Sequence, residues 1–287
     1  MMDTLAFRVM RVVTYSVPLT IGCLLLAAVL LPSMLSPLFY DLDLARIASS
    51  GLNLPPSWEH PLGTQSEGRD VLALILVGTP ATLTIGLIGG GIGVLVGTFL
   101  GMVSGYFGGR LDTMIRNTVD VGMTIPPFAI LIMIAASFKV VTLPLMGVAV
   151  AISAWMYPTR VIRSQVLSIR TRGYVRMARL SGIGDLRIIF GELLPNLIPL
   201  ITAAAVNAIA VSILASIGLE VLGLGGQNVT LGTTIYFAIY YASMWRGLWW
   251  WWLPPVLVLV AIFLGLFLVS MALDEVANPK LRGGASS

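Results

Sequence analysis

Long apolar runs separated by shorter polar stretches dominate the sequence. Six runs reach or approach the roughly 20 residues that a helix needs to cross a bilayer. They cover residues 12–35, 79–104, 114–138, 143–156, 197–217 and 253–273, and the fourth is the shortest. A cleavable signal has a shorter apolar core of about 7–15 residues, so the first run predicts an uncleaved span. The pattern predicts an all-α, polytopic membrane protein with six transmembrane helices.

The connections between these runs differ in length and polarity. Residues 41–70 form a polar, acidic connection, and we expect residues 71–78 to form a short helix at the membrane interface. The largest charged connection covers residues 157–196. Residues 218–252 form a long connection that is rich in glycine and aromatic residues.

Basic residues are unevenly distributed among the connections. Six spans place both termini on one side of the membrane, and the segments on that side hold 13 of the 17 lysines and arginines. Cytoplasmic loops of membrane proteins are enriched in basic residues. We therefore expect both termini and the loop 157–196 to be cytoplasmic, and the loop 41–70 to be external.

The chain divides accordingly into three parts. Residues 1–70 hold the N-terminal helix and the external loop. Residues 71–278 form the membrane core with the other five helices, including the cytoplasmic loop 157–196. Residues 279–287 form a cytoplasmic tail.

Composition excludes a soluble or a disordered chain. Apolar residues make up 57% of the sequence and charged residues only 10%, against about 25% charged in a typical soluble domain. The mean hydropathy is +0.94, whereas disorder requires low hydrophobicity. The net charge is +4, but the arginines lie beside apolar runs. We therefore expect the lipid bilayer as a partner and no nucleic acid.

The sequence offers little catalytic or metal-binding chemistry. The Gly-Lys-Ser/Thr of a phosphate-binding loop is absent, because the two lysines follow Phe138 and Pro279. If the protein uses ATP, another chain must bind it. The single cysteine, Cys23, and the single histidine, His60, provide no metal-ligand cluster. We expect His60 to be an ordinary loop residue, and the chain not to be an enzyme.

A row of glycines marks the second span. Gly93, Gly97 and Gly101 recur every four residues and therefore lie on one face of a helix. Such a face allows another helix to approach closely in lipid. Tight packing within the chain is one interpretation, and a pore-lining or moving helix is the other.

The third span holds two further candidates. Pro126, followed by a second proline, interrupts the span and predicts either a static kink or a gating element. Asp120 lies about two turns before this break. An acidic residue within a span is a functional candidate, although a water-facing position would also satisfy its charge.

The most informative segment is the charged connection 157–196. Around Gly182, basic residues alternate with apolar ones at helical spacing, and Asp185 stands where a second short helix would begin. Two short helices that meet near Gly182 would form a knob outside the bilayer. The alternatives are a knob that docks on a partner and a basic loop that adheres to anionic headgroups.

This segment resembles the EAA loop of bacterial ABC-importer permeases. That pattern is Glu-Ala-Ala, three residues, Gly and a later Leu-Pro. Here Ala178, Gly182, Leu194 and Pro195 match, whereas Arg176 and Met177 stand where Glu and Ala are usual. The resemblance implies that the residues that couple the permease to its ATPase are Tyr174, Arg176, Ala178, Arg179, Gly182, Asp185 and Leu186.

The resemblance extends over almost the whole chain. The chain is similar to the C-type subunit of the dipeptide/oligopeptide/nickel transporter family, a binding-protein-dependent transport system inner membrane component. The matching motifs are His60-Pro61-Leu62-Gly63-Thr64, Gly68-Arg69-Asp70-Val71-Leu72, Ser104-Gly105-Tyr106-Phe107-Gly108-Gly109, Val119-Asp120 and Leu222-Gly223-Leu224-Gly225.

The resemblance implies a permease subunit with the type I ABC importer fold in a bacterial or archaeal inner membrane. The implied partners are a homologous B-type permease, two ATPase subunits or domains and an extracytoplasmic solute-binding protein. This chain would bind no cofactor, because ATP and Mg would sit on the ATPase. The implied solute is a dipeptide or oligopeptide, with an oligosaccharide or a nickel chelate as the alternatives. The aromatic stretch 236–252 slightly raises the sugar option, but aromatic residues at a membrane interface give the same pattern. An ion channel is a remote alternative, because no span offers a filter or a charged ring.

Overall fold

The computed structural model describes residues 17–138 and 141–277, and these residues contain helices but no β-strand. Within these residues, four helices are long and apolar enough to span a membrane alone, and the number of spans is six if each of two bent helix pairs forms one span. The all-α, six-span prediction is thereby confirmed.

The main helices are α2 (Val17–Leu35), α3 (Val71–Phe107), α4 (Gly109–Thr124), α5 (Pro127–Ser137), α6 (Leu143–Ala154), α7 (Met156–Ile169), α8 (Gly173–Leu180), α9 (Asp185–Ile188), α10 (Leu194–Leu219), α11 (Leu231–Tyr240) and α12 (Trp249–Ala277). Short turns complete them: η1 (Ser36–Leu38), η2 (Leu42–Ala45), η3 (Ile189–Leu193) and η4 (Glu220–Leu224).

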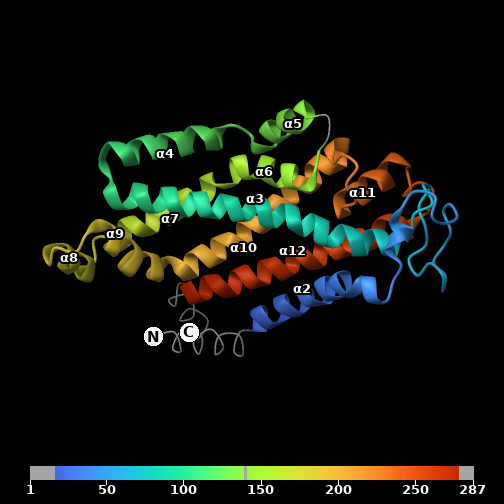
Figure 1. The fold of residues 1–287 in the computed structure, drawn as a ribbon, viewed down its shortest axis with the longest axis horizontal. Coiled ribbons are helices and arrows are strands. Elements are labelled where there is room, and N and C mark those ends of the chain that lie inside the picture. The colour runs from blue at the N-terminus through green and yellow to red at the C-terminus, as the bar shows by residue number, and fades with distance from the viewer. Residues whose placement is uncertain (1–16, 139–140, 278–287) are drawn as a thin grey trace.

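Helix α3 forms the centre of the molecule. Helices α6, α7 and α10 pack along it, α12 and α2 pack beyond α10, and α4 and α5 form an outer layer on the other side (Figure 1). The predicted residues 12–16 of the first span and the tail 279–287, with residue 278, lie outside the described residues.

The glycines of α3 allow this close packing. A Cβ atom on Gly97 would lie 2.7 Å from the Pro158 Cβ, and one on Gly101 would lie 2.8 Å from the Thr159 carbonyl oxygen. Gly93 likewise faces Ala154 at 2.8 Å. Since real Cβ contacts are longer, the backbones of α3 and of the α6–α7 pair touch only because these side chains are absent. The glycine row therefore packs against other helices of this chain.

Two of the predicted boundaries are wrong. Residues 71–78 are not a separate interfacial helix, because α3 is one helix of 37 residues that begins at Val71. Val71 and Leu74 are buried, so they belong to the core. Residues 157–169 belong to α7 rather than to a loop, and α7 continues the fourth span after a 43° bend. A hydropathy profile does not mark this helix as a span, because its arginines lower the mean hydropathy. Its apolar face nevertheless packs on α3.

The third predicted span consists of α4 and α5, which meet at an angle of 79°. Pro126 and the following proline lie at this break, where the missing amide hydrogens end the helical hydrogen-bonding ladder. The predicted connection 218–252 is also partly helical, since it contains α11.

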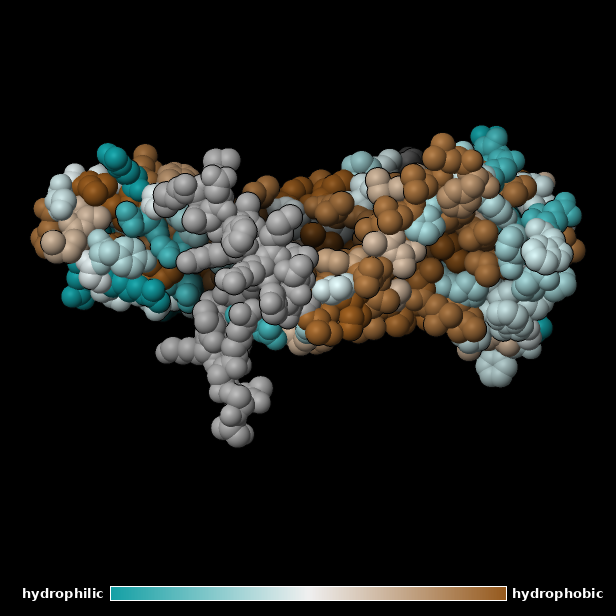
Figure 2. Space-filling view, turned by 90° about the horizontal axis from the view of Figure 1, so that it is seen from below, coloured by the Kyte–Doolittle hydropathy of each residue, from teal (hydrophilic) through white to brown (hydrophobic). Residues whose placement is uncertain are grey.

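On the face seen in Figure 2, apolar side chains cover the middle of the molecule between two more polar ends. We call residues 173–193 at one end the knob and residues 36–70 at the opposite end the cap (Figure 1). Such a band is what the hydrocarbon region of a bilayer requires.

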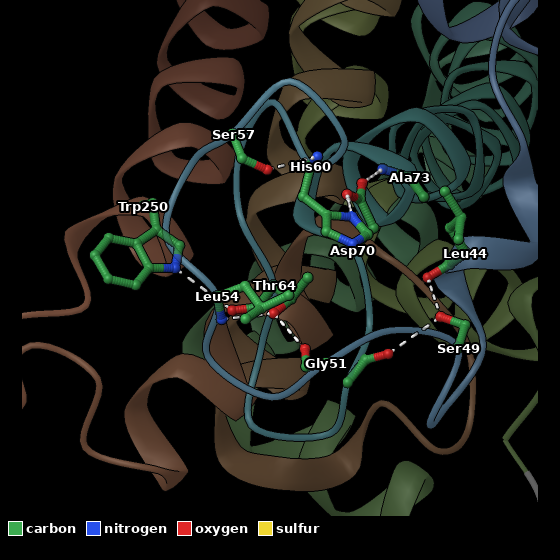
Figure 3. Close-up of polar contacts among 11 residues, drawn as sticks. Leu44, Ser49, Gly51, Leu54, Ser57, His60, Thr64, Asp70, Ala73 and Trp250 are labelled. Carbon is green, nitrogen blue, oxygen red and sulfur yellow. Dashed lines mark hydrogen bonds and ion pairs between the residues drawn. The ribbon is translucent and has the colours of Figure 1, made fainter.

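Buried polar contacts hold the cap together (Figure 3). The Asp70 carboxylate accepts a hydrogen bond from the Ala73 amide at 2.8 Å, which caps α3, and its other oxygen lies 2.9 Å from the His60 Nδ1. His60 lies in a loop, as predicted, but its imidazole is buried. Burial, followed by the nearby Asp70 carboxylate, raises the pKa of the Tyr40 hydroxyl, so this phenol stays neutral.

Candidate functional site

The knob is a helix–turn–helix whose turn depends on Gly182. The Gly182 amide donates to the Arg179 carbonyl at 3.0 Å, and the Ile183 amide donates to the Ala178 carbonyl at 3.1 Å. These two bonds form the Schellman motif, which places its glycine at positive φ. Gly182 has φ +76°, and no atom lies within 4 Å of the position that a Cβ would occupy. A β-branched residue there would be strained by its backbone angle alone.

The knob has one buried face and one exposed apolar face. Val175, Ile188 and Ile189 are buried in a cluster that continues into α7 and α10. The exposed apolar side chains, with their exposed fractions, are Tyr174 (39%), Met177 (63%), Leu180 (82%), Leu186 (70%) and Phe190 (60%). An exposed apolar patch of this kind at a polar end of a molecule marks an interaction surface.

The predicted knob residues divide between the two faces. Tyr174, Arg176 and Leu186 are exposed, and so are Arg179, Gly182 and Asp185. Ala178 is only 7% exposed and packs inside the knob's own core. Its side chain therefore contacts this chain, and a charged residue at this position would act first on the fold of the knob.

The knob and the segment that leads into it are joined to the end of α3 by contacts that sequence analysis does not predict. The Tyr106 hydroxyl donates to the Asp185 carboxylate at 2.6 Å. The Arg170 guanidinium donates to the Gly105 carbonyl at 2.8 Å. Tyr106 and Asp185 are 79 residues apart in sequence, so no local pattern indicates their contact.

A second polar network joins α3, α4 and α7 close to the knob. Arg163 on α7 binds both carboxylate oxygens of Asp112 on α4, at 2.5 and 2.7 Å. The Ser104 hydroxyl on α3 donates to the same carboxylate at 2.5 Å. Bidentate arginine–carboxylate pairs fix geometry as well as charge. This network therefore sets how the outer α4–α5 layer sits on the core.

Asp120 and Pro126 lie in the outer layer, away from the knob. Both are exposed. Asp120 borders a small cavity of about 130 Å³ together with Arg116, Arg160 and Arg163. The Asp120 carboxylate therefore lies among basic side chains and does not contact the knob.

One buried carboxylate escaped the sequence analysis. Glu220, in the π-helical turn η4, is fully buried, and its carboxylate lies beside Thr230 and Gly232 at the N-terminus of α11. The carboxylate faces the first turn of α11, where a Cβ on Gly232 would collide with it. The available signal was an acidic residue that follows an apolar run by three positions.

The described residues contain no group of three or more side chains that could hold a metal ion. The surfaces outlined above are built for helix packing and for protein contact. The knob lies at one polar end of a helix bundle that has an apolar band.

Comparison with known proteins gives a consistent result. Residues 97–283 match the family model of the binding-protein-dependent transport system inner membrane component. The oligopeptide transport system permease protein OppC of Mycobacterium bovis is 33% identical over 74% of this chain and 72% of its own length. The dipeptide transport system permease protein DppC of Haemophilus influenzae is 30% identical over 91% of this chain and 90% of its own.

Solved structures share the fold at lower identity. A chain of the inward-facing MetNI methionine ABC transporter matches with a TM-score of 0.59 and 20% identity, over 72% of this chain and 95% of that one. A chain of an amino acid ABC transporter with histidines matches with a TM-score of 0.50 and 19% identity, over 74% of this chain and 94% of that one.

Proposed function

Because this chain belongs to the family of binding-protein-dependent transport system inner membrane components, we propose that it is the C-type permease subunit of an ATP-driven peptide importer. The observation that carries the proposal is the match to a dipeptide permease along nine-tenths of both chains. The chain is a transport subunit, and ATP hydrolysis belongs to a separate ATPase chain that holds ATP and Mg.

The proposed partners follow from the surfaces of the molecule. The exposed apolar face of the knob, flanked by Arg176 and Arg187, fits a groove on an ATPase subunit or domain. A homologous B-type permease would pack on the exposed apolar side chains of the α4–α5 layer, among them Met123 and Met133. The translocation pathway would then lie between the two permeases, and an extracytoplasmic solute-binding protein would deliver the solute at the cap.

The proposed orientation places the knob and both termini in the cytoplasm of a bacterial or archaeal cell. The knob end carries most of the arginines, whereas the cap carries Asp41, Asp43 and Glu59. This distribution follows the positive-inside rule.

The proposed solute class is a peptide of two or more residues. The relatives at 33% and 30% identity are oligopeptide and dipeptide permease proteins. An oligosaccharide is less well supported, because these relatives are named for peptides, although Trp245 and Trp249 of the aromatic stretch are exposed. A nickel chelate is the other alternative.

The test is ATP-dependent uptake by the complete transporter in proteoliposomes. The probes are radiolabelled di-, tri- and penta-alanine, a nickel–histidine chelate and maltotriose. We expect uptake of at least one peptide. This uptake should require ATP on the side of the membrane that carries the ATPase, and it should also require the binding protein. Uptake of the chelate or of the sugar alone would replace the peptide assignment, and no ATP-dependent uptake of any probe would refute the importer.

The knob provides the sharpest variant for this test. Gly182→Val should leave membrane insertion intact but lower ATPase co-purification and uptake by about tenfold, because valine does not tolerate φ +76°. Gly184→Val is the matched control, since Gly184 has φ −65° and ψ 150° and no neighbouring atom within 4 Å. A knob that only binds lipid headgroups would instead tolerate Gly182→Val and fail when Arg172 and Arg179 are neutralised.

A further inference from the structure

Tyr106, in the last turn of α3, contacts both helices of the knob. Its hydroxyl donates to the Asp185 carboxylate at 2.6 Å, and the Arg179 guanidinium lies 4.6 Å from the centre of its ring. Arg179 belongs to the last turn of α8, and Asp185 is the first residue of α9. A single side chain therefore bridges α3 to both halves of the knob. We call Tyr106, Arg179 and Asp185 the Tyr106 clamp.

The position of the Tyr106 ring is fixed by its surroundings. The residue is 3% exposed and belongs to the apolar cluster that includes Val166, Val175 and Ile188. The Phe107 ring also stacks edge-on against it at 5.1 Å. Since a close-packed ring has little freedom, the hydroxyl points to one place. Its bond to a carboxylate is of the stronger, charge-assisted kind.

A second contact holds the same end of α3. The Arg170 guanidinium, just after α7, donates to the carbonyl oxygens of Gly105 at 2.8 Å and of Tyr106 at 3.3 Å. These carbonyls belong to the last turn of α3, which has no helical partners for them. The end of α3 is therefore bound to the knob and to the segment that leads into it, in addition to the covalent links through α7 and α10.

On the basis of the proposed function, in which an ATPase docks on the knob, we propose that Tyr106 is a positioning residue, and that a displacement of the knob during ATP hydrolysis passes through it to α3. Helix α3 is a single helix of 37 residues that begins directly after the cap and ends at the knob. Its glycines contact the α6–α7 pair and α10 directly. A shift of the knob is therefore carried along α3 to the opposite end of the molecule. Without the tyrosine hydroxyl, the knob still docks but moves without pulling α3.

The experiment compares Tyr106→Phe with the wild type in the complete transporter in proteoliposomes. Phenylalanine keeps the ring and its contact with Arg179 and removes only the hydroxyl. We expect unchanged ATPase co-purification and about a tenfold rise in the ATP hydrolysed per peptide imported, in line with the loss of one hydrogen bond to a charged group. Tyr240→Phe, at an exposed tyrosine in α11, is the matched control.

A double variant tests whether the two residues act together. Tyr106→Phe with Asp185→Ala should be no worse than Asp185→Ala alone, because both remove the same bond. Additive losses would overturn the proposal. The proposal would also be overturned if Tyr106→Phe hydrolysed as much ATP per imported peptide as the wild type. Equal losses of assembly, hydrolysis and uptake would overturn it too, because they indicate a merely structural role.

Hydrogen exchange of the knob amides gives a readout that needs no transport. Tyr106→Phe should speed exchange in residues 173–190 several-fold in the isolated chain, and unchanged exchange would refute the clamp. If the wild-type complex shows no ATP-dependent uptake, the proposed function fails, and the exchange rates still decide whether Tyr106 fixes the knob.

Discussion

At the scale of single residues, Asp70 is the most heavily used side chain of the cap. It is fully buried, accepts the Ala73 amide at the start of α3 and contacts the His60 imidazole. An acidic residue at a helix N-terminus also interacts favourably with the helix dipole. One carboxylate thus links the first turn of the longest helix in the described residues to the loop that covers it.

Asp70→Ala should destabilise the protein by about 2–4 kcal/mol, because it removes a helix cap and leaves the buried His60 without its partner. Asp70→Asn should cost less, since its side-chain oxygen still accepts the Ala73 amide. The measurement is the apparent thermal unfolding midpoint in detergent. Equal midpoints for Asp70→Ala and the wild type would show that the Asp70 carboxylate contributes nothing to stability.

At the scale of elements, the contact of α3 with the α6–α7 pair depends on glycine. Gly93 and Gly97 face the bend between α6 and α7, and Gly101 faces the first half of α7. Glycines spaced four residues apart therefore keep the backbone of α3 in contact with the α6–α7 pair on both sides of its bend. In a membrane, close packing of this kind is a main source of helix association.

Gly101→Leu should separate α3 from α7, because a Cβ alone would already lie 2.8 Å from the Thr159 carbonyl oxygen. Overpacking lowers stability by about 1–3 kcal/mol, and by more where the added side chain collides with backbone atoms. Gly91→Leu is the control, since the same helix leaves the space beside Gly91 open. Size-exclusion profiles in detergent should show loss of the folded species for Gly101→Leu only. Identical profiles for the two variants would contradict the packing role.

At the scale of the whole molecule, the two polar ends lie on opposite sides of the apolar band (Figure 2). The knob end is basic and the cap is acidic. Together with an even number of spans, this asymmetry fixes a single expected orientation in the membrane.

Single cysteines at Ser181 and Trp58, in a Cys23→Ser background, test that orientation. Both sites are exposed, Ser181 in the knob and Trp58 in the cap. A membrane-impermeant maleimide should label Trp58→Cys in intact spheroplasts and Ser181→Cys only in inverted vesicles. Labelling of both sites from the same side would refute the six-span topology.

The sequence by itself determined the number of spans, the glycine contact face and the turn at Gly182. Each depends on local spacing or on the backbone freedom of one residue, which a linear pattern records. The asymmetry of basic residues is equally local, and the orientation inferred from it stays a prediction.

The tertiary structure alone decided where helices continue and which polar groups meet. A hydropathy profile does not detect helix α7, because its arginines lower the mean hydropathy of the segment. In the folded chain these arginines face Asp112 or solvent, and the apolar side of the helix packs on α3. Residues 71–78 join α3 because burial against the cap and α11 stabilises them as part of the core. The burial of Ala178 and Glu220 and the bond from Tyr106 to Asp185 arise between segments far apart in sequence. Such contacts depend on how the helices pack, and no spacing within one segment encodes them.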